Sequence, residues 1–253
     1  MNNEDSKLAF QGGWKYSPAP ENTDHIKIND HYGLFINNEF MEPAGGSYFD
    51  TVNPATEEIL SSMAVANSDD VDRAVKAARK SMSGHWKKIK PKERAKYIYR
   101  IARLLQERAR EFSVIESLDG GKPIRESRDI DIPLAAAHFF YYAGWADKLD
   151  YAFPGCKPKP VGVAGQVIPW NFPLLMAAWK IAPALACGNS IVLKPAETTS
   201  LTAMKLAEII QEADIPPGVV NIITGAGDIG AEIVNHPGVD KIAFAATPPN
   251  KKI

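Results

Sequence analysis

The pattern of apolar runs and turn residues is clearest between Val161 and Glu197. A β-branched, glycine-containing run from Val161 to Ile168 leads into a proline-bounded turn, Pro169 to Pro173. An apolar segment of helical length, Leu174 to Cys187, comes next, and a second short apolar run, Ser190 to Leu193, follows it. These lengths and their Pro and Gly boundaries predict a strand, a turn, a helix and a second strand.

The same alternation continues toward the C-terminus. We predict a helix over Leu201 to Ala213, a strand over Val219 to Thr224, a helix over Asp228 to Asn235 and a strand over Lys241 to Phe244. Helices that alternate with short apolar strands imply a parallel sheet with helices on both faces. The fold class predicted is therefore α/β, with a Rossmann-like sheet.

Before Val161 the pattern is mainly helical. From Leu34, alternating residues suggest an edge hairpin that turns at Asn37 and Asn38. Ser68 is the expected N-cap of the first helix, because acidic residues follow it directly. Apolar positions at helical spacing predict a second helix from Pro91 to Glu116 and a third from about Pro133 to Leu149.

Two segments separate from this pattern. Residues 1–32 are polar and contain Gly and Pro pairs, so we expect a flexible N-terminal tail. Residues 150–160 are rich in Pro and Gly and are expected to be a connector. The segments 33–149 and 161–253 are then expected to form a single dinucleotide-binding domain.

The composition narrows the class of protein. The 253 residues carry a net charge of -1 and 45% hydrophobic residues, which is typical of a globular protein and gives no reason to expect a nucleic-acid partner. The longest apolar stretch is interrupted by Lys180 and Pro183, so we expect no membrane span. The first ten residues lack a signal-peptide core, and the two cysteines show no paired spacing, which favours a reduced, cytoplasmic setting. The five histidines have no ligand spacing, and we expect no metal site.

The predicted strand–helix–strand unit indicates a nucleotide site. In such sheets a ligand lies beyond the carboxyl ends of parallel strands, and an acidic residue after the second strand accepts hydrogen bonds from ribose hydroxyls. Glu197 has that position and favours NAD over NADP, because a carboxylate repels the additional phosphate; Lys194 would partly offset this repulsion. The residues Gly225 to Gly230 also fit the spacing GxGxxG, but they follow the third strand of the unit rather than the first.

The phrase IPWNFPLLMAAWKIAPALACGNSIVLKPAE closely resembles the aldehyde dehydrogenase superfamily, and the resemblance extends from about Gly33 to Phe244. It implies an NAD(P)-dependent oxidation of an aldehyde to a carboxylic acid, through a thiohemiacetal and a thioester. It also implies that Asn171 is an oxyanion-hole donor. The cofactor-contacting positions implied are Ile168, Pro169, Trp170, Lys194, Glu197, Gly227, Gly230 and Thr247. Without that phrase, Trp170 could equally be a core aromatic, Asn171 a helix N-cap and Lys194 a surface charge.

After Phe244 the sequence departs from the family pattern. Pro248 and Pro249 remove two amide donors where the family binds pyrophosphate, so a weaker phosphate grip is expected. In the family the catalytic cysteine and the general-base glutamate lie beyond this point, and neither Cys156 nor Cys187 matches the nucleophile. The resemblance therefore implies a cofactor-binding portion that is incomplete at the C-terminus, has no catalytic domain and is inactive alone.

Aldehyde would accordingly be a substrate only if a catalytic half is supplied. The family's bridging hairpin, which reaches another subunit, looks shortened at residues 150–160, so a homo-oligomer and a hetero-oligomer both stay possible. Two other interpretations remain open. The chain is a non-catalytic nucleotide-binding or assembly module, or it is the remnant of a frameshifted gene.

Overall fold

The computed structural model describes residues 26–245, and its centre is a six-stranded sheet of order β3-β2-β8-β7-β6-β9. Four of these strands are parallel: β6 (Val163–Val167), β7 (Ser190–Lys194), β8 (Val220–Ile222) and β9 (Lys241–Phe244). β6, β8 and β9 lie within or coincide with runs predicted from the sequence, and β7 extends one residue beyond its predicted run, Ser190 to Leu193. The α/β fold with a Rossmann-like parallel sheet is confirmed.

An antiparallel hairpin completes one edge of this sheet. It consists of β2 (Leu34–Ile36) and β3 (Glu39–Met41), and Phe35 of β2 pairs with Ile222 of β8. Asn37 and Asn38 both have positive φ angles, 57° and 69°, as a two-residue turn between antiparallel strands requires. The hairpin was predicted at these residues, and its pairing makes the sheet mixed rather than wholly parallel.

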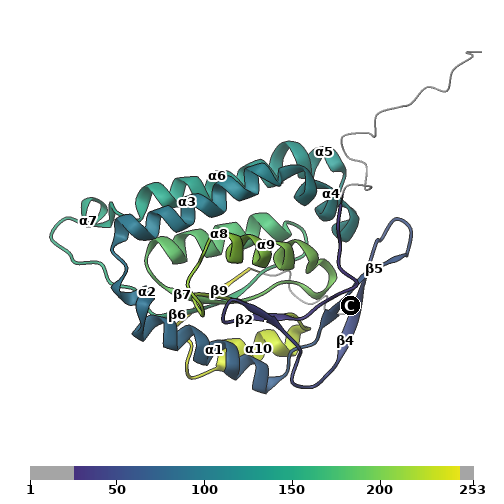
Figure 1. Cartoon of the computed structure of the whole chain (residues 1–253), viewed down its shortest axis with the longest axis horizontal. Coiled ribbons are helices and arrows are strands. Elements are labelled where there is room, and N and C mark those ends of the chain that lie inside the picture. Colours follow the sequence, from purple (N-terminus) through teal and green to yellow (C-terminus); the bar gives the residue numbers. More distant parts are fainter. Residues whose placement is uncertain (1–25, 246–253) are drawn as a thin grey trace, which may run out of the picture.

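Helices cover both faces of the sheet (Figure 1). On one face lie α8 and α9, with α3 and α6 forming a further layer outside them; on the other face lie α1 and α10. Their bounds are Ser68–Ser83 for α1, Pro91–Glu107 for α3, Ile132–Trp145 for α6, Pro173–Ala186 for α8, Leu201–Glu212 for α9 and Gly227–Asn235 for α10. Because each face of the sheet is covered, there are two apolar cores, one on either side of it.

A small second sheet contains the first described strand. It has the order β1-β5-β4, with β1 at His31–Tyr32, β5 at Ile59–Ala64 and β4 at Tyr48–Val52. Tyr32 is buried, so the last residues of the segment expected to be a flexible tail are ordered against the domain. Residues 1–25 of that segment lie outside the described part of the chain.

The helix predicted from Pro91 to Glu116 is two helices. The first, α3, ends at Glu107, and α4 begins at Ala109 and runs to Gly120. Arg108 between them has a ψ angle of 15°, outside the helical range, and its guanidinium binds Glu111 and Glu208. The apolar spacing continued across the break, so the sequence pattern could not reveal it.

The N-cap of α1 also differs from the prediction. Asn67, not Ser68, caps the helix, because its side chain accepts from the amide of Asp70 at 3.1 Å while the Asp70 carboxylate accepts from the Asn67 amide. The remaining elements are short: α2 (His85–Lys88), α5 (Ile124–Glu126), the π-helix η1 (Ser127–Asp131), α7 (Leu149–Ala152) and the 3₁₀-helix η2 (Glu197–Thr199). The expected connector, residues 150–160, thus begins inside α7.

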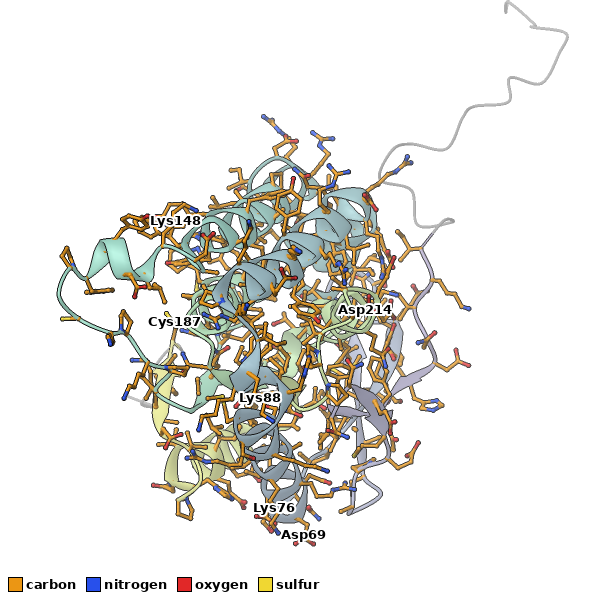
Figure 2. All side chains as sticks on the ribbon, turned by 60° about the vertical axis from the view of Figure 1, so that its left-hand side comes forward. Asp69, Lys76, Lys88, Lys148, Cys187 and Asp214 are labelled. Carbon is orange, nitrogen blue, oxygen red and sulfur yellow. The ribbon has the colours of Figure 1, made fainter. Side chains whose placement is uncertain are left out.

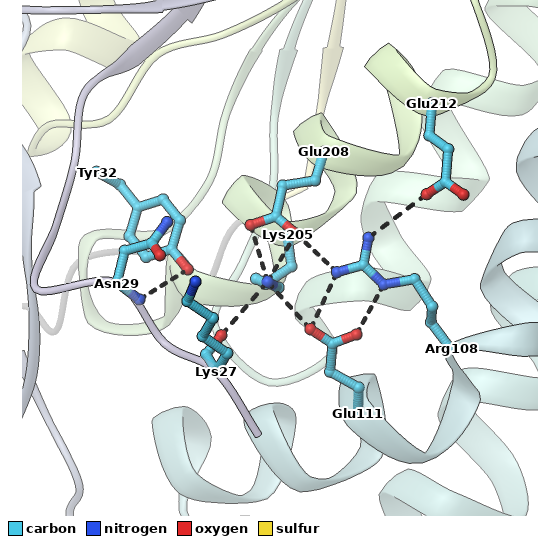
Figure 3. Close-up of polar contacts among 8 residues, drawn as sticks. All are labelled: Lys27, Asn29, Tyr32, Arg108, Glu111, Lys205, Glu208 and Glu212. Atoms are coloured by element: carbon cyan, nitrogen blue, oxygen red, sulfur yellow. Dashed lines mark hydrogen bonds and ion pairs between the residues drawn. The ribbon is translucent and has the colours of Figure 1, made fainter. Parts of the chain in front are cut away.

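A cluster of charged side chains ties the N-terminal segment to α4 and α9 (Figure 3). Lys205 is almost fully buried, and its ammonium lies 3.0 Å from Glu111 and 2.6 Å from Glu208. It also donates to the backbone carbonyl of Lys27 at 3.4 Å. Arg108 binds the same two carboxylates, so the two cations share them.

Candidate functional site

The order of the parallel strands defines one crevice. Along the sheet they follow the order β8-β7-β6-β9, so the order in which successive strands are added reverses between β6 and β9, although all four strands run parallel. Val167, at the end of β6, pairs with Lys194 on one side and with Phe244 on the other. Ligands of doubly wound sheets bind outside the carboxyl ends of the strands at such a reversal. Lys194 and the turn that follows Val167 therefore lie at the end of the sheet where this rule expects a ligand.

Lys194 and Glu197 form a pair at the carboxyl end of β7. The Lys194 ammonium lies 3.1 Å from a Glu197 carboxylate oxygen, and the Lys194 side chain is only 4% exposed whereas that of Glu197 is 50% exposed. Partial burial raises the pKa of Glu197, but a hydrogen bond from its own backbone amide and the charge of Lys194 outweigh burial and hold its pKa below the usual value. Glu197 is therefore an ionised acceptor that is held in place and open to solvent.

The turn after β6 carries the other predicted contacts. Ile168 is buried, and its amide donates to the Lys194 carbonyl at 3.2 Å, which joins the ends of β6 and β7. Pro169 is half-buried, whereas Trp170 is 54% exposed and Asn171 is exposed. Within residues 26–245 the Asn171 side-chain amide has no hydrogen-bond partner and caps no helix. Neither residue is a core or capping residue, so both are available to a ligand.

The glycines at the start of α10 differ in their surroundings. At Gly225 φ is +153°, and a β-carbon would lie 2.6 Å from Ile229, so glycine is required there. A β-carbon on Gly227 would meet open space, and one on Gly230 would make an ordinary contact, 3.8 Å, with the Lys194 side chain. Gly230 thus lies beside the Lys194–Glu197 pair. The position that needs glycine is Gly225, which the sequence interpretation included in the GxGxxG spacing but not among the cofactor contacts.

Thr247, the remaining predicted cofactor contact, lies outside the described residues. Across residues 26–245 no group of His, Cys, Asp and Glu side chains could hold a metal ion. None of the helices in that same range is long and apolar enough to cross a membrane.

Two buried carboxyl groups next to the site were missed by the sequence interpretation. Glu116 and Asp119 lie on α4 and are 1% and 3% exposed. Burial raises the pKa of Glu116 to about 7, although Lys122 and the Leu174 amide oppose this shift. Burial likewise raises the pKa of Asp119 to about 6, against its hydrogen bonds from Thr51 and Leu201. No local pattern distinguished them, because their partners come from distant segments.

The two cysteines lie away from Asn171. Cys187, labelled in Figure 2, directly follows the last residue of α8, whereas Asn171 lies two residues before the first. A 14-residue helix separates them, which corresponds to about 20 Å. Burial raises the pKa of the Cys187 thiol, which disfavours the nucleophilic thiolate. Cys156 is exposed in the segment between α7 and β6.

A family model described as "Aldehyde dehydrogenase family" matches residues 40–250 of the chain. The chain is 46% identical over 224 residues to an aldehyde dehydrogenase of Alternaria alternata, covering 85% of this chain and 45% of that protein. It is 43% identical over 254 residues to the mitochondrial aldehyde dehydrogenase of Rattus norvegicus, covering 96% of this chain and 48% of the relative. The chain therefore spans about half the length of these relatives.

A solved structure shares the fold. The NAD⁺ complex of an aldehyde dehydrogenase from Bacillus cereus superposes with a TM-score of 0.80 at 43% sequence identity, covering 87% of this chain and 48% of that one. Fold, family model and relatives agree on the family.

Proposed function

Because the chain belongs to the aldehyde dehydrogenase family, we propose that it forms the NAD-binding part of an enzyme that oxidises an aldehyde to a carboxylic acid. The observation that carries this proposal is the Lys194–Glu197 pair at the end of β7. A half-exposed, ionised carboxylate beside a strand-order reversal suits the paired hydroxyls of a ribose. The NAD⁺ complex of the Bacillus cereus relative supports the same ligand class.

The residues fit NAD better than NADP. The ammonium of Lys194 is buried and already paired with Glu197 at 3.1 Å. The carboxylate largely offsets its positive charge, so Lys194 would attract an additional phosphate only weakly. Glu197 is ionised at neutral pH, because its pKa lies below the ordinary value once the backbone hydrogen bond and Lys194 outweigh burial. A 2′-phosphate next to this carboxylate would be repelled.

The other residues of the site have separate roles. Trp170 offers an exposed ring at the end of β6, and open space over Gly227 leaves room for a ligand at the start of α10. Asn171 has a free side-chain amide that can donate to an oxyanion developing on an aldehyde carbonyl. When bound, NAD supplies the hydride acceptor of the oxidation.

We infer that the chain does not oxidise aldehydes by itself. The route through a thiohemiacetal and a thioester requires a thiolate within bonding distance of the substrate carbonyl, and Cys187 is separated from Asn171 by the whole of α8. Cytoplasmic location and oligomeric state stay predictions. An aldehyde substrate would require a catalytic half from the same or another chain.

Titration calorimetry of the full chain with NAD and with NADP tests the proposal. We expect NAD to bind at least about tenfold more tightly than NADP, and Glu197→Gln to weaken NAD binding and narrow this ratio. Glu107→Gln is the matched control, because Glu107 is an exposed glutamate at the end of α3, paired with Arg103 at 3.2 Å. Equal affinity for both cofactors, or an unchanged ratio in Glu197→Gln, would contradict the assignment of Glu197. Absence of binding by either cofactor would refute the proposed function.

A further inference from the structure

Glu116 of α4 forms a hydrogen bond with the first turn of α8. One of its carboxylate oxygens accepts from the Leu174 amide at 3.3 Å, and the other is buried with no hydrogen-bond partner among the described residues. Pro173, the first residue of α8, has no amide hydrogen, so Leu174 carries the first free donor of the helix. A carboxylate at this position also interacts favourably with the helix dipole.

The turn between β6 and α8 has few other polar anchors. At one end the Ile168 amide donates to Lys194, and at the other the Leu174 amide donates to Glu116. Between them, Trp170 and Asn171 make no hydrogen bonds to any described residue. Their orientation therefore depends on how firmly the two ends are held.

Glu116 and Asn171 also border the same cavity. It has a volume of about 290 Å³, and its walls come from the end of α4, the segment after it and the turn before α8. The lining residues are Glu116, Gly120, Gly121, Lys122, Trp170, Asn171, Phe172 and Pro173. A change in the charge of Glu116 therefore changes the electrostatic potential in the cavity that Trp170 and Asn171 line.

Three charged groups surround Glu116. Lys122 lies 4.0 Å above the ring of Phe172 and forms a close ion pair with Asp131 of η1. Asp119 follows Glu116 on α4, and α8 contributes the Leu174 amide rather than a charged side chain. Burial is the largest effect and raises the pKa of Glu116 to about 7; Lys122 and the Leu174 amide oppose it, and Asp131 and Asp119 add to it. Both forms of the carboxyl group are thus populated near neutral pH.

We propose that Glu116 is a positioning residue, whose ionisation tightens the hydrogen bond to Leu174 and so fixes Trp170 and Asn171 in the orientation that receives the cofactor and the substrate. An ionised acceptor binds an amide about twice as strongly as a neutral one. The hydrogen bond from Leu174 to Glu116 lies three residues from Asn171. Among the described residues, this end of the turn is bound by a side chain that can ionise, whereas the Ile168 end is bound by the backbone carbonyl of Lys194. The functional part of this proposal rests on the proposed NAD-binding role.

The direct test follows backbone and side-chain amides of the full chain by NMR between pH 5.5 and 8.5. We expect the Leu174 amide proton to titrate with a midpoint near 7, and the Asn171 side-chain amide and the Trp170 indole to titrate with it. Glu116→Gln keeps an acceptor oxygen but cannot ionise, so all three titrations should disappear. Asp119→Asn is the matched control on the same helix: its carboxylate accepts from Leu201 at 2.9 Å, so the variant should keep the Leu174 titration, with its midpoint lower because Asp119 no longer raises the pKa of Glu116.

A second measurement connects the titration to ligand binding. The affinity for NAD should increase by about two- to fivefold from pH 6 to pH 8 in the wild-type chain and stay flat in Glu116→Gln. A Leu174 amide that titrates while Trp170 and Asn171 do not, or an identical pH profile in both proteins, would overturn the positioning role. If neither protein binds NAD at any pH, the proposed function fails, and the three NMR titrations still decide whether Glu116 orients the turn.

Discussion

Replacement of Lys205 by Met should strongly destabilise the fold. The ammonium of Lys205 is the buried centre of the charged cluster between α4, α9 and the N-terminal segment. Methionine keeps most of the unbranched apolar stem and is a good helix former, so packing and helix propensity change little. The substitution therefore tests the charge itself.

The structure sets the expected magnitude. Lys205 is 6% exposed and binds Glu111 and Glu208 at 3.0 and 2.6 Å. Removing one partner of a fully buried ion pair costs about 3–5 kcal/mol. Here the two carboxylates are 20% and 25% exposed and each keeps Arg108, so part of the cost is relieved. We expect Lys205→Met to lower the free energy of unfolding by about 2–3 kcal/mol.

Urea unfolding followed by circular dichroism measures this difference, and Lys96→Met is the matched control. Lys96 forms an equivalent i,i+3 pair with Glu93 at 2.8 Å, but the two side chains are 61% and 52% exposed. Such a pair contributes roughly 0–0.5 kcal/mol, because water screens it. A Lys205→Met variant within about 0.5 kcal/mol of the wild type, or one no worse than Lys96→Met, would refute the reasoning.

The stability difference between Lys205→Met and the wild type should also depend on pH. Burial raises the pKa of Glu111, but its bonds to Arg108 and Lys205 outweigh burial and leave the pKa below 4.5. A depressed native pKa stabilises the fold above the unfolded pKa, and this stabilisation is lost as the pH falls through the native value. The difference between Lys205→Met and wild type should therefore shrink well below pH 4.5.

Three further predictions concern single positions. Asn67→Ala should cost about 1 kcal/mol in urea unfolding because it removes the cap of α1, whereas Ser68→Ala at the exposed neighbouring position should change stability by less than about 0.5 kcal/mol. Gly218→Ala should lower the melting temperature by at least about 8 °C, since φ is +80° and the new β-carbon would lie 2.4 Å from the Ala77 carbonyl oxygen. Burial raises the pKa of Asp119 from 3.8 to about 6, so this carboxyl makes the fold less stable as the pH rises through that interval; Asp119→Asn should flatten that part of a melting-temperature profile against pH, and an unchanged slope would contradict it.

The local sequence pattern was sufficient to predict an element where the residue types favour the backbone conformation that the element adopts. The strand Lys241–Phe244 and the turn at Asn37 and Asn38 follow from residue types that favour those conformations. The cap at Asn67 was placed one residue late, because Asn and Ser are both good caps and only the reciprocal bond with Asp70 distinguishes them. Arg108, at the break between α3 and α4, binds Glu208, a hundred positions away, and no window of sequence contains both.

In the candidate site, too, some contacts could be predicted from local sequence and others could not. Lys194 and Glu197 are three residues apart, so their pairing could be anticipated from the chain itself. Glu116 acts on Leu174, 58 positions later, and its altered acidity arises from burial by segments that no local pattern brings together. Buried carboxyl groups of this kind are therefore found from packing rather than from motifs.

The hairpin at the edge of the large sheet has a consequence for the timing of folding. The Asn37 amide donates to the side chain of Asn221, 184 positions later, and Phe35 pairs with Ile222 of β8. Leu34, Phe35 and Ile36 are all buried in the finished fold. At a synthesis rate of about 5–20 residues per second, β8 is synthesised roughly 10–40 s after these three apolar residues. During that interval the hairpin is an unpaired, apolar edge, so the newly made chain passes through an aggregation-prone stage that the finished sheet conceals.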